Sequence, residues 1–300
     1  MNQAIRIRES WGDRLLLTFV YAALGFITIA VAYPIIYIIS SSFSSSAAVM
    51  GGKVWFLPVD PTLYGYAAVF KYHQIWTGYL NSIIYTGAGS TLSVALTIMM
   101  AYPISRKTFA GRNIFVWLLL FAMLFSGGLI PYYLVVRNLH LLGTVWAMIL
   151  PGALSIYSVI VAKSFFQSSI PNDLYEAAQI DGCSDAGFLV KVVLALSKPV
   201  IAVLFLWSAV GNWNSYFNAL IFLNDAGMYP LQLVLREILV NNNVDTNSMT
   251  LSAEQLKHFE DMRTLLKYSI IVISSIPVLI LYPFIQKYFV QGVMVGAIKE

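Results

Sequence analysis

Charged residues are scarce in this sequence. Asp, Glu, Lys and Arg make up 11% of the 300 residues, whereas apolar types make up 59%. Because soluble domains usually carry about 25% charged residues, a chain so poor in charge could not cover a surface that faces water. The 18 basic and 14 acidic residues leave a net charge of +4, which is too sparse for a phosphate-binding patch and argues against nucleic acid as a partner. The composition therefore indicates an integral membrane protein.

Groups that carry covalent or metal chemistry are also few. Cys183 is the only cysteine, so no internal disulfide can form, and with three scattered histidines it makes a poor set of metal ligands. The nucleotide-binding pattern G-x-x-x-x-G-K-[ST] is absent, since Gly51-Gly52-Lys53 is followed by Val54. We therefore expect a chain without a catalytic residue, without a metal site and without a bound cofactor.

What the sequence does contain is long apolar runs. Six stretches approach the length of about 20 residues that a helix needs to cross the hydrocarbon core, and none contains Asp, Glu, Lys, Arg or His. The fourth and sixth are short, and each should extend by a turn into flanking sequence. The pattern predicts an all-α, polytopic membrane protein with six transmembrane helices. The expected spans are Leu15–Ile39, Tyr79–Ile104, Ile114–Val136, Val145–Ala162, Val200–Leu223 and Tyr268–Ile285.

Lys and Arg concentrate in the short loops on the side of the N-terminus. Because such loops are usually cytoplasmic, both termini are expected in the cytoplasm. The first span runs on past Ala30-Val31-Ala32, so we do not expect it to be a cleaved signal peptide. The resulting division is a cytoplasmic N-terminus (1–14), a six-helix domain (15–291) with a cytoplasmic loop (167–198) and an external loop (224–266), and a cytoplasmic tail (292–300).

Two external segments differ in character. The serine-rich stretch from Ser40 to Ser46 is expected to be a flexible, solvated turn. In the external loop 224–266, Ser252-Ala253-Glu254-Gln255 reads as a capping box that opens an amphipathic helix. This loop could dock an external partner, or it could be a lid packed on its own spans.

The cytoplasmic loop 167–198 contains the clearest local signals. Pro171 should stop the preceding helix, and Asn172 or Asp173 can cap the next one. Gly182 suits a left-handed turn after that helix, Ser184 or Asp185 can start a second one, and Pro199 marks the entry to the fifth span. The loop is therefore predicted to be a short helix, a tight turn and another short helix. Adjacent alanines would let another protein approach closely, although an ordinary amphipathic connector fits the pattern as well.

Several of these residues match a known pattern. Glu176-Ala177-Ala178, Asp181-Gly182 and the distant Pro199 resemble the EAA loop of permease subunits in binding-protein-dependent ABC importers. Further motifs are similar to the carbohydrate-uptake permeases related to the maltose permease MalG, and within them to the branch labelled LplC or YtcP. These motifs are Asn81-Ser82, the stretch from Ser126 to Pro131, Tyr229-Pro230-Leu231-Gln232 and the stretch from Tyr282 to Phe289. The resemblance covers nearly the whole chain, and it departs from the family at the terminal Lys299-Glu300.

The resemblance implies an ABC type I importer permease fold, also called MetI-like, in the cytoplasmic membrane of a bacterium. It implies a second homologous permease subunit, two copies of an ABC ATPase that carry ATP and Mg, and an extracytoplasmic solute-binding lipoprotein that delivers an oligosaccharide or polysaccharide fragment. It also implies alternating access driven by an ATPase docked on a coupling helix. The ATPase-docking residues would be Glu176, Ala177, Ala178, Asp181 and Gly182.

Polar residues of the fifth span indicate a path for the sugar. Sugars are bound by hydrogen bonds to hydroxyl groups and by aromatic faces, and amides inside a span are costly against lipid. Asn214 and Asn218 are four residues apart and would share one helix face. Hydrogen bonding to the partner permease is the alternative explanation. The expected path residues are Trp213, Asn214, Tyr216, Asn218 and, after Pro131, Tyr132, whereas Tyr85, Tyr102 and Tyr157 are left unassigned.

Two other classes fit less well. An ion-coupled secondary transporter usually needs acidic or basic residues inside the membrane, and the predicted spans contain none. An intramembrane enzyme would need a catalytic constellation at membrane depth, but His73, His140 and His258 all fall in external loops. The sequence does not name the sugar.

Overall fold

The computed structural model describes residues 10–241 and 253–297, and every regular element in these ranges is a helix. The chain divides into two compact units. The first holds Met1–Lys71 and Val244–Ile273, and the second holds Tyr72–Asn243 and Ser274–Glu300. The longest helix, α15 (Ala253–Ala297), contributes to both units. The predicted all-α class is confirmed for the described residues.

The first unit contains α1 (Trp11–Ser42), α2 (Ser46–Met50), α3 (Tyr64–Lys71) and the first part of α15. Helix α3 lies so close to α15 that a Cβ at Gly65 would stand 2.9 Å from the backbone oxygen of Leu265. Ser46 donates to Asp261 at 2.6 Å, and the rings of Tyr37 and Tyr268 meet edge to face. Small residues and polar pairs thus fix the packing of this unit.

The serine-rich stretch is buried, so the expectation of a flexible, solvated turn is wrong. Ser40, Ser41, Ser42 and Ser44 are all less than 5% exposed. The hydroxyl of Ser40 donates to the carbonyl of Phe56 at 2.7 Å, and that of Ser44 donates to the carbonyl of Ser40 at 2.6 Å. The returning chain supplies hydrogen-bond partners for Ser40 and for Ser44, which also accepts from the backbone N–H of Val59 at 3.1 Å, so the burial of these two hydroxyls is compensated. The buried hydroxyl of Ser41 has no hydrogen-bond partner among the described residues.

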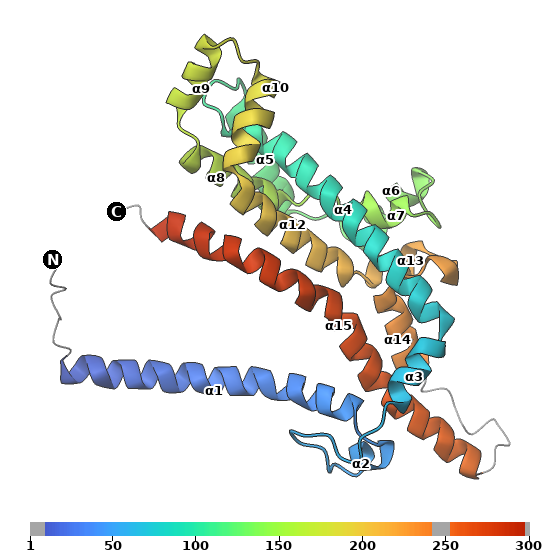
Figure 1. Cartoon of the computed structure of the whole chain (residues 1–300). Coiled ribbons are helices and arrows are strands. Elements are labelled where there is room, and N and C mark those ends of the chain that lie inside the picture. The colour runs from blue at the N-terminus through green and yellow to red at the C-terminus, as the bar shows by residue number, and fades with distance from the viewer. Residues whose placement is uncertain (1–9, 242–252, 298–300) are drawn as a thin grey trace. The chain divides into compact units, whose positions relative to one another are not determined.

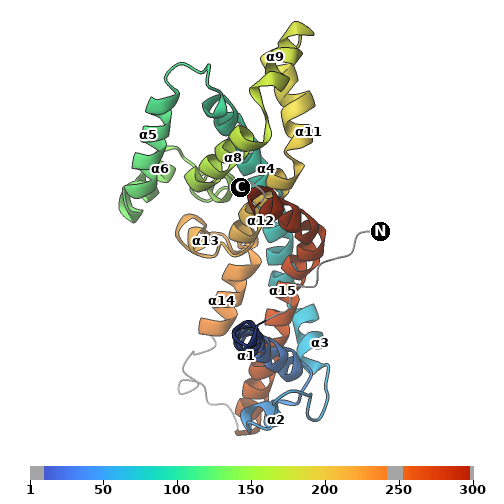
Figure 2. The same ribbon diagram turned by 90° about the vertical axis from the view of Figure 1, so that its left-hand side faces the viewer.

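The second unit is built around α4 (His73–Ser105). This helix packs against α8 (Ile156–Ser169), α12 (Lys198–Trp213) and α14 (Leu231–Asn241), as Figure 1 shows. The main apolar core of the unit lies where α4, α8 and α12 meet, with Ala101, Val159, Ala162 and Leu204 all at most 2% exposed. Helix α9 (Asn172–Ile180) and α14 lie at opposite ends of this unit (Figures 1 and 2).

Three predicted spans are not continuous helices. The third is divided into α5 (Arg112–Leu124) and α6 (Leu129–Asn138), which meet at 114°. The fourth is divided into α7 (Trp146–Ile149) and α8, and the fifth into α12 and α13 (Phe217–Phe222). Among the described residues, three helical segments are long and apolar enough to cross a membrane, namely Trp11–Ser42, His73–Ser105 and Asp261–Pro283, or up to five if each of two bent pairs counts as one span.

The second bent pair has a physical cause. A run of α10 (Asp185–Phe188), the π-helical η1 (Leu189–Val193) and α11 (Leu194–Leu196) meets α12 at 82°. Pro199 stands in the first turn of α12, where it offers no N–H to the preceding turn and its ring opposes continuation of the helix. Pro199 therefore stands at the beginning of α12, the helix to which the sequence assigned the fifth span, and the crossing itself stays a prediction.

The predicted external loop 224–266 contains η2 (Ala226–Met228), α14 and the beginning of α15. Helix α15 runs without interruption from Ala253 to Ala297. It therefore includes the predicted sixth span and most of the predicted tail 292–300. Residues 1–9 of the predicted N-terminal segment, Ser252 of the predicted capping box and residues 298–300 lie outside the described residues.

Candidate functional site

The predicted docking loop forms a helix, a turn and a second helix, as the sequence indicated, although the first helix begins slightly earlier than expected. Helix α8 ends at Ser169, and Pro171 stands at the N-cap of α9, where Asn172 or Asp173 had been expected. Gly182 has φ +74°, the left-handed turn that glycine adopts without strain. The hydroxyl of Ser184 then accepts a hydrogen bond from the backbone N–H of Gly187 at 3.2 Å and caps α10. Local chemistry thus defines the loop.

One side of α9 is attached to the second unit through Tyr175. Its ring meets the ring of Phe188 edge to face at 5.3 Å, and its hydroxyl donates to Oδ1 of Asp185 at 2.6 Å. Gln179 in turn donates to the Tyr175 hydroxyl at 2.8 Å. Ala178 packs against the apolar core from the same side. Because its hydroxyl donates to Asp185, the pKa of Tyr175 is raised above its ordinary value.

A buried cation joins α4 to this attachment. Arg106 follows the last residue of α4 and is 8% exposed. Its guanidinium carbon lies 5.0, 5.9 and 5.4 Å from the ring centroids of Tyr102, Tyr175 and Phe188. These rings belong to α4, α9 and α10, so the cation lies among three elements. Within the described part of the chain, its Nε and Nη2 atoms have no hydrogen-bond partner.

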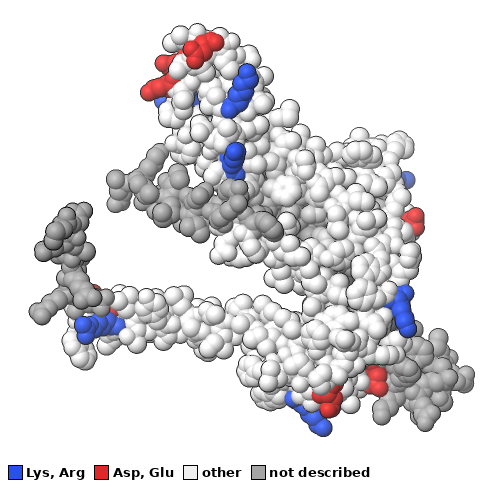
Figure 3. Space-filling view, in the orientation of Figure 1, with Lys and Arg blue, Asp and Glu red and all other residues white. Residues whose placement is uncertain are grey.

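The other side of α9 is open. Glu176, Ala177 and Asp181 are exposed, and Ile180 is 87% exposed, which is unusual for so large an apolar side chain. Gly182 is also exposed, and a Cβ there would meet no atom within 4 Å. Figure 3 shows that acidic side chains gather over this part of the molecule. The predicted docking residues therefore lie together on one accessible, acidic surface, except Ala178, which is half-buried.

The predicted path residues lie where α12 ends and α13 begins. Trp213 is 4% exposed, and its indole N–H donates to the carbonyl of Ser274 at 3.1 Å. Asn214 follows the end of α12 and donates to the carbonyl of Val210 at 2.8 Å. Tyr216 is exposed, and Asn218 is half-buried in the first turn of α13.

Because the helix is interrupted between them, Asn214 and Asn218 do not share one helix face, and that step of the sequence argument is wrong. Trp213 packs within the second unit instead of opening onto a cavity. Tyr132 stands on another helix, α6, where its ring lies 5.6 Å from that of Phe222 at the end of α13. Their common role as a path stays a prediction.

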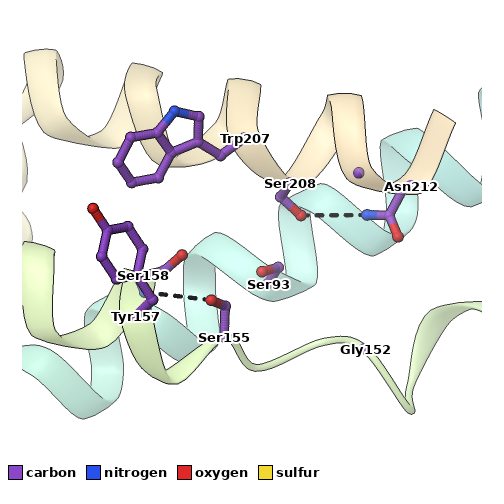
Figure 4. A pocket seen from close by; sticks show the side chains of 9 residues that line it. Ser93, Gly152, Ser155, Tyr157, Ser158, Trp207, Ser208 and Asn212 are labelled. Carbon is purple, nitrogen blue, oxygen red and sulfur yellow. Dashed lines mark hydrogen bonds between the residues drawn. The ribbon is translucent and has the colours of Figure 1, made fainter. Parts of the chain in front are cut away.

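A pocket that sequence reasoning missed lies between α4, α8 and α12. Its volume is about 380 Å³. Tyr157 and Trp207 face each other at one end, with ring centroids 5.6 Å apart, whereas Asn212 lies farther along α12 (Figure 4). The lining residues are Ser93, Gly152, Ser155, Tyr157, Ser158, Trp207, Ser208, Gly211 and Asn212. The polar run that begins at Asn212 was a sequence signal for this pocket. The pairing of Tyr157 with Trp207 could not be foreseen, because the two residues come from distant segments of the chain.

Two motifs that are far apart in the sequence meet at the other end of α4. The amide of Asn81 donates to the carbonyls of Gly227 and Tyr229, at 2.8 and 3.1 Å. The hydroxyl of Ser82 accepts from the backbone N–H of Leu231 at 2.8 Å. Asn81-Ser82 therefore anchors the segment Tyr229-Pro230-Leu231 to α4, so two motifs that the sequence singled out separately form one contact.

Comparison with known proteins agrees with this architecture. A family model described as the binding-protein-dependent transport system inner membrane component matches residues 3–295. Protein LplC of Bacillus subtilis (strain 168) is 41% identical over 271 residues, which cover 89% of this chain and 88% of LplC. The polygalacturonan/rhamnogalacturonan transport system permease protein YtcP of the same strain is 38% identical over 287 residues, which cover 96% of this chain and 99% of YtcP.

A solved structure is similar as well. A chain in the crystal structure of a bacterial ABC transporter involved in the import of the acidic polysaccharide alginate is 36% identical, with a TM-score of 0.85. The match covers 94% of this chain and 99% of that one. ABC transporter permeases of this kind are non-catalytic subunits, and ATP is hydrolysed by a separate subunit, as the sequence predicted. The chain therefore belongs to the family of inner membrane components of binding-protein-dependent transport systems and has the MetI-like permease fold.

Proposed function

We propose that this chain is a permease subunit of an ATP-driven importer that moves an oligosaccharide or polysaccharide fragment across the cytoplasmic membrane of a bacterium. The observation that carries the proposal is α9. It presents Glu176 and Ala177 on an accessible surface and is followed by the exposed, left-handed Gly182, in a chain of the binding-protein-dependent family. The printed names of YtcP and of the alginate transporter support a polysaccharide-derived substrate. The family match disfavours an ion-coupled secondary transporter.

The partners follow from this role. An extracytoplasmic binding protein delivers the sugar, a second homologous permease completes the channel, and two ABC ATPase copies hold ATP and Mg. The ATPase docks on the open side of α9. Ala177 allows close approach, Ile180 offers an apolar contact, and the acidic side chains favour a basic patch on the ATPase. Closure of the ATPases pulls on α9 and drives alternating access.

Six segments cross the bilayer in this proposal, with both termini in the cytoplasm. Helices α1, α4 and the apolar part of α15 are long enough alone. Helices α5, α8 and α12 have 13, 14 and 16 residues. At about 1.5 Å per residue they are shorter than the hydrocarbon core of about 30 Å. Adjoining broken segments complete these three crossings, and the sugar passes near Tyr132, Trp213, Asn214, Tyr216 and Asn218.

Charge reversal on α9 tests the docking surface. The tagged, full-length chain is purified in mild detergent from its native membrane, and the co-purifying proteins are identified by mass spectrometry. We expect wild type to retain an ABC ATPase and a second permease. Glu176→Lys should retain the second permease but reduce the ATPase by about tenfold or more, because a desolvated interfacial charge is worth about 2 kcal/mol or more.

Glu237→Lys makes the same charge change on α14 and serves as the matched control. It should leave the ATPase bound. Full ATPase recovery with Glu176→Lys would place docking elsewhere, and a wild-type chain that recovers no ATPase at all would refute the proposed function.

A further inference from the structure

The chain that follows α2 folds back along α1 before it enters α3. We infer that this return loop, residues 51–59, is a lipid-binding anchor that inserts its apolar tip into the bilayer beside α1. The tip consists of Trp55, Phe56 and Leu57. The inference requires that α1 crosses the membrane, as in the proposed function, but it does not depend on the substrate or on docking of the ATPase.

Contacts with α1 fix the level of the loop tip along that helix. The ring of Phe56 meets the ring of Tyr33 edge to face at 5.4 Å, and the backbone carbonyl of Phe56 accepts from the hydroxyl of Ser40. Tyr33 stands nine residues before Ser42, the last residue of α1, which is about 13 Å at about 1.5 Å per residue. Figure 1 shows the loop beside this part of α1. Because the predicted span ends at Ile39, the tip is level with the last turns of the span.

The inner side of the return loop is packed and hydrogen-bonded. Val54 is 3% exposed and lies in an apolar cluster with Ala48 and Tyr37. At the end of the loop, the backbone carbonyl of Val59 accepts from the backbone N–H of Ser45 at 3.1 Å. These contacts hold the loop in one conformation, so its tip is presented outward by a built structure.

The outer side of the loop is apolar and open. Trp55 is 63% exposed, Leu57 is 77% exposed, and Phe56 between them is also exposed. Contiguous apolar patches of this kind usually mark a surface that binds a membrane or another protein. Every residue in the most apolar stretch of α1 is also at least partly exposed. The patch therefore continues a surface that faces lipid in the proposed arrangement.

The charge of the loop favours a bilayer surface over a protein partner. Lys53 is exposed and is the only charged residue between Ser42 and Asp60. Its ammonium group can reach lipid phosphates while the apolar tip enters the boundary between headgroups and acyl chains. Tryptophan is also favoured at this depth. A protein-binding surface would be expected to have a polar rim, whereas residues 54–59 are all apolar.

Spin labels can measure the depth of the tip. The complete importer is reconstituted in phospholipid vesicles in a Cys183→Ser background, and a nitroxide is attached to one introduced cysteine at a time. Leu57→Cys probes the tip, and Lys53→Cys in the same loop is the matched control. Phe26→Cys and Ile35→Cys, at exposed positions of α1, calibrate depth. Collisions with oxygen, which concentrates in lipid, and with a water-soluble nickel chelate are measured at each position.

We expect the label at Leu57 to lie about 5–10 Å below the headgroup level, as for other interfacial anchors. It should collide more with oxygen than with nickel, as the label at Ile35 does, whereas the label at Lys53 should show the reverse. Adding Trp55→Asp to Leu57→Cys should raise the nickel collisions of the label, because a carboxylate beside the tip opposes its insertion into lipid.

The other outcomes separate the inference from the proposed function. A label at Leu57 that meets nickel as readily as the label at Lys53 would show that the tip faces water, and it would overturn the anchor. A label that meets neither reagent, with or without the binding protein, would also overturn it, because a protein would then cover the tip. A nickel-accessible label at Phe26 would instead refute the crossing of α1 and with it the proposed six-span arrangement.

Discussion

At the scale of single residues, Tyr175 attaches α9 to the rest of the second unit. Its ring packs on Phe188, and its hydroxyl joins Asp185 to Gln179. The neighbouring Arg106 fixes the position of that ring with a buried positive charge. A helix so attached can be pulled by a partner without sliding over the core. In the proposed function, the strength of this attachment bears directly on how motion of the ATPase reaches the spans.

We predict that Tyr175→Phe loosens α9 without releasing it. The ring contacts remain, but two hydrogen bonds of a partly exposed hydroxyl are lost, at a cost of about 0.5–1 kcal/mol. Amide hydrogen exchange of α9 in the purified complex should accelerate by roughly two- to fivefold. Tyr21→Phe, which alters an exposed tyrosine of α1, is the control. Unchanged exchange in α9 would show that the hydroxyl contributes nothing to the attachment.

The hydrogen bond from Tyr175 to Asp185 predicts how the attachment of α9 depends on pH. The pKa of Tyr175 is raised because its neutral hydroxyl donates to Asp185. A raised pKa gives stability that is complete below the ordinary tyrosine value of about 10 and is lost as the pH rises through the raised value. The ratio of the α9 amide exchange rates of Tyr175→Phe and wild type should therefore stay constant from about pH 6 to 9. A difference that disappears within that range would contradict the assignment.

At the scale of elements, the turn between α9 and α10 depends on one backbone conformation. Gly182 has φ +74°, and the space beside it is open, so a substitution there changes backbone strain without a steric clash. The turn sets the angle between α9 and α10. Strain at this position would therefore alter the docking surface without altering its side chains.

We predict a graded effect at Gly182. Asparagine tolerates the left-handed conformation, so Gly182→Asn should keep most of the bound ATPase, whereas Gly182→Val should lose most of it. The measurement is the amount of ATPase that co-purifies with the tagged chain. Gly25→Val on α1 is the control, because a Cβ at Gly25 also meets no atom within 4 Å. Gly152 has equally open surroundings but lines the pocket, so it is not used. If Gly182→Asn and Gly182→Val retained equal amounts of ATPase, backbone strain at Gly182 would be excluded as the cause of any loss.

At the scale of the whole molecule, the proposed orientation places α9 in the cytoplasm. The second unit supports a directional arrangement, since α9 and the anchored segment Tyr229-Pro230-Leu231 lie at opposite ends of α4. Asn81 and Ser105 of that helix are about 36 Å apart at about 1.5 Å per residue, which exceeds the thickness of the hydrocarbon core. The two ends therefore face opposite sides of the membrane in the proposal.

The single cysteine makes this orientation measurable. Cys183 stands in the α9–α10 turn and is half-buried. We predict that a membrane-impermeant maleimide labels it only after cells are permeabilised. In a Cys183→Ser background, Lys53→Cys places the thiol at an exposed position on the other predicted side and should be labelled in intact cells. The reverse pattern would invert the proposed topology.

The sequence by itself determined the membrane class and the outline of the docking loop. Scarce charge excludes a soluble fold, and Pro171, Gly182, Ser184 and Pro199 act through chemistry confined to a few neighbouring residues: a missing N–H, a left-handed φ or a side-chain cap. Such effects need no knowledge of the rest of the fold. The loop boundaries could therefore be read in advance.

Only the tertiary structure decided which polar side chains are buried with hydrogen-bond partners and which line a pocket. Hydropathy places Ser40 to Ser44 next to a span but cannot show that returning chain hydrogen-bonds and buries them. The same pattern cannot show where a span is broken, as between Asn214 and Asn218. The pocket that unites Ser93, Tyr157 and Trp207 depends on contacts between segments many tens of residues apart. Local pattern carries no information on such contacts, because they form only when α4, α8 and α12 pack together.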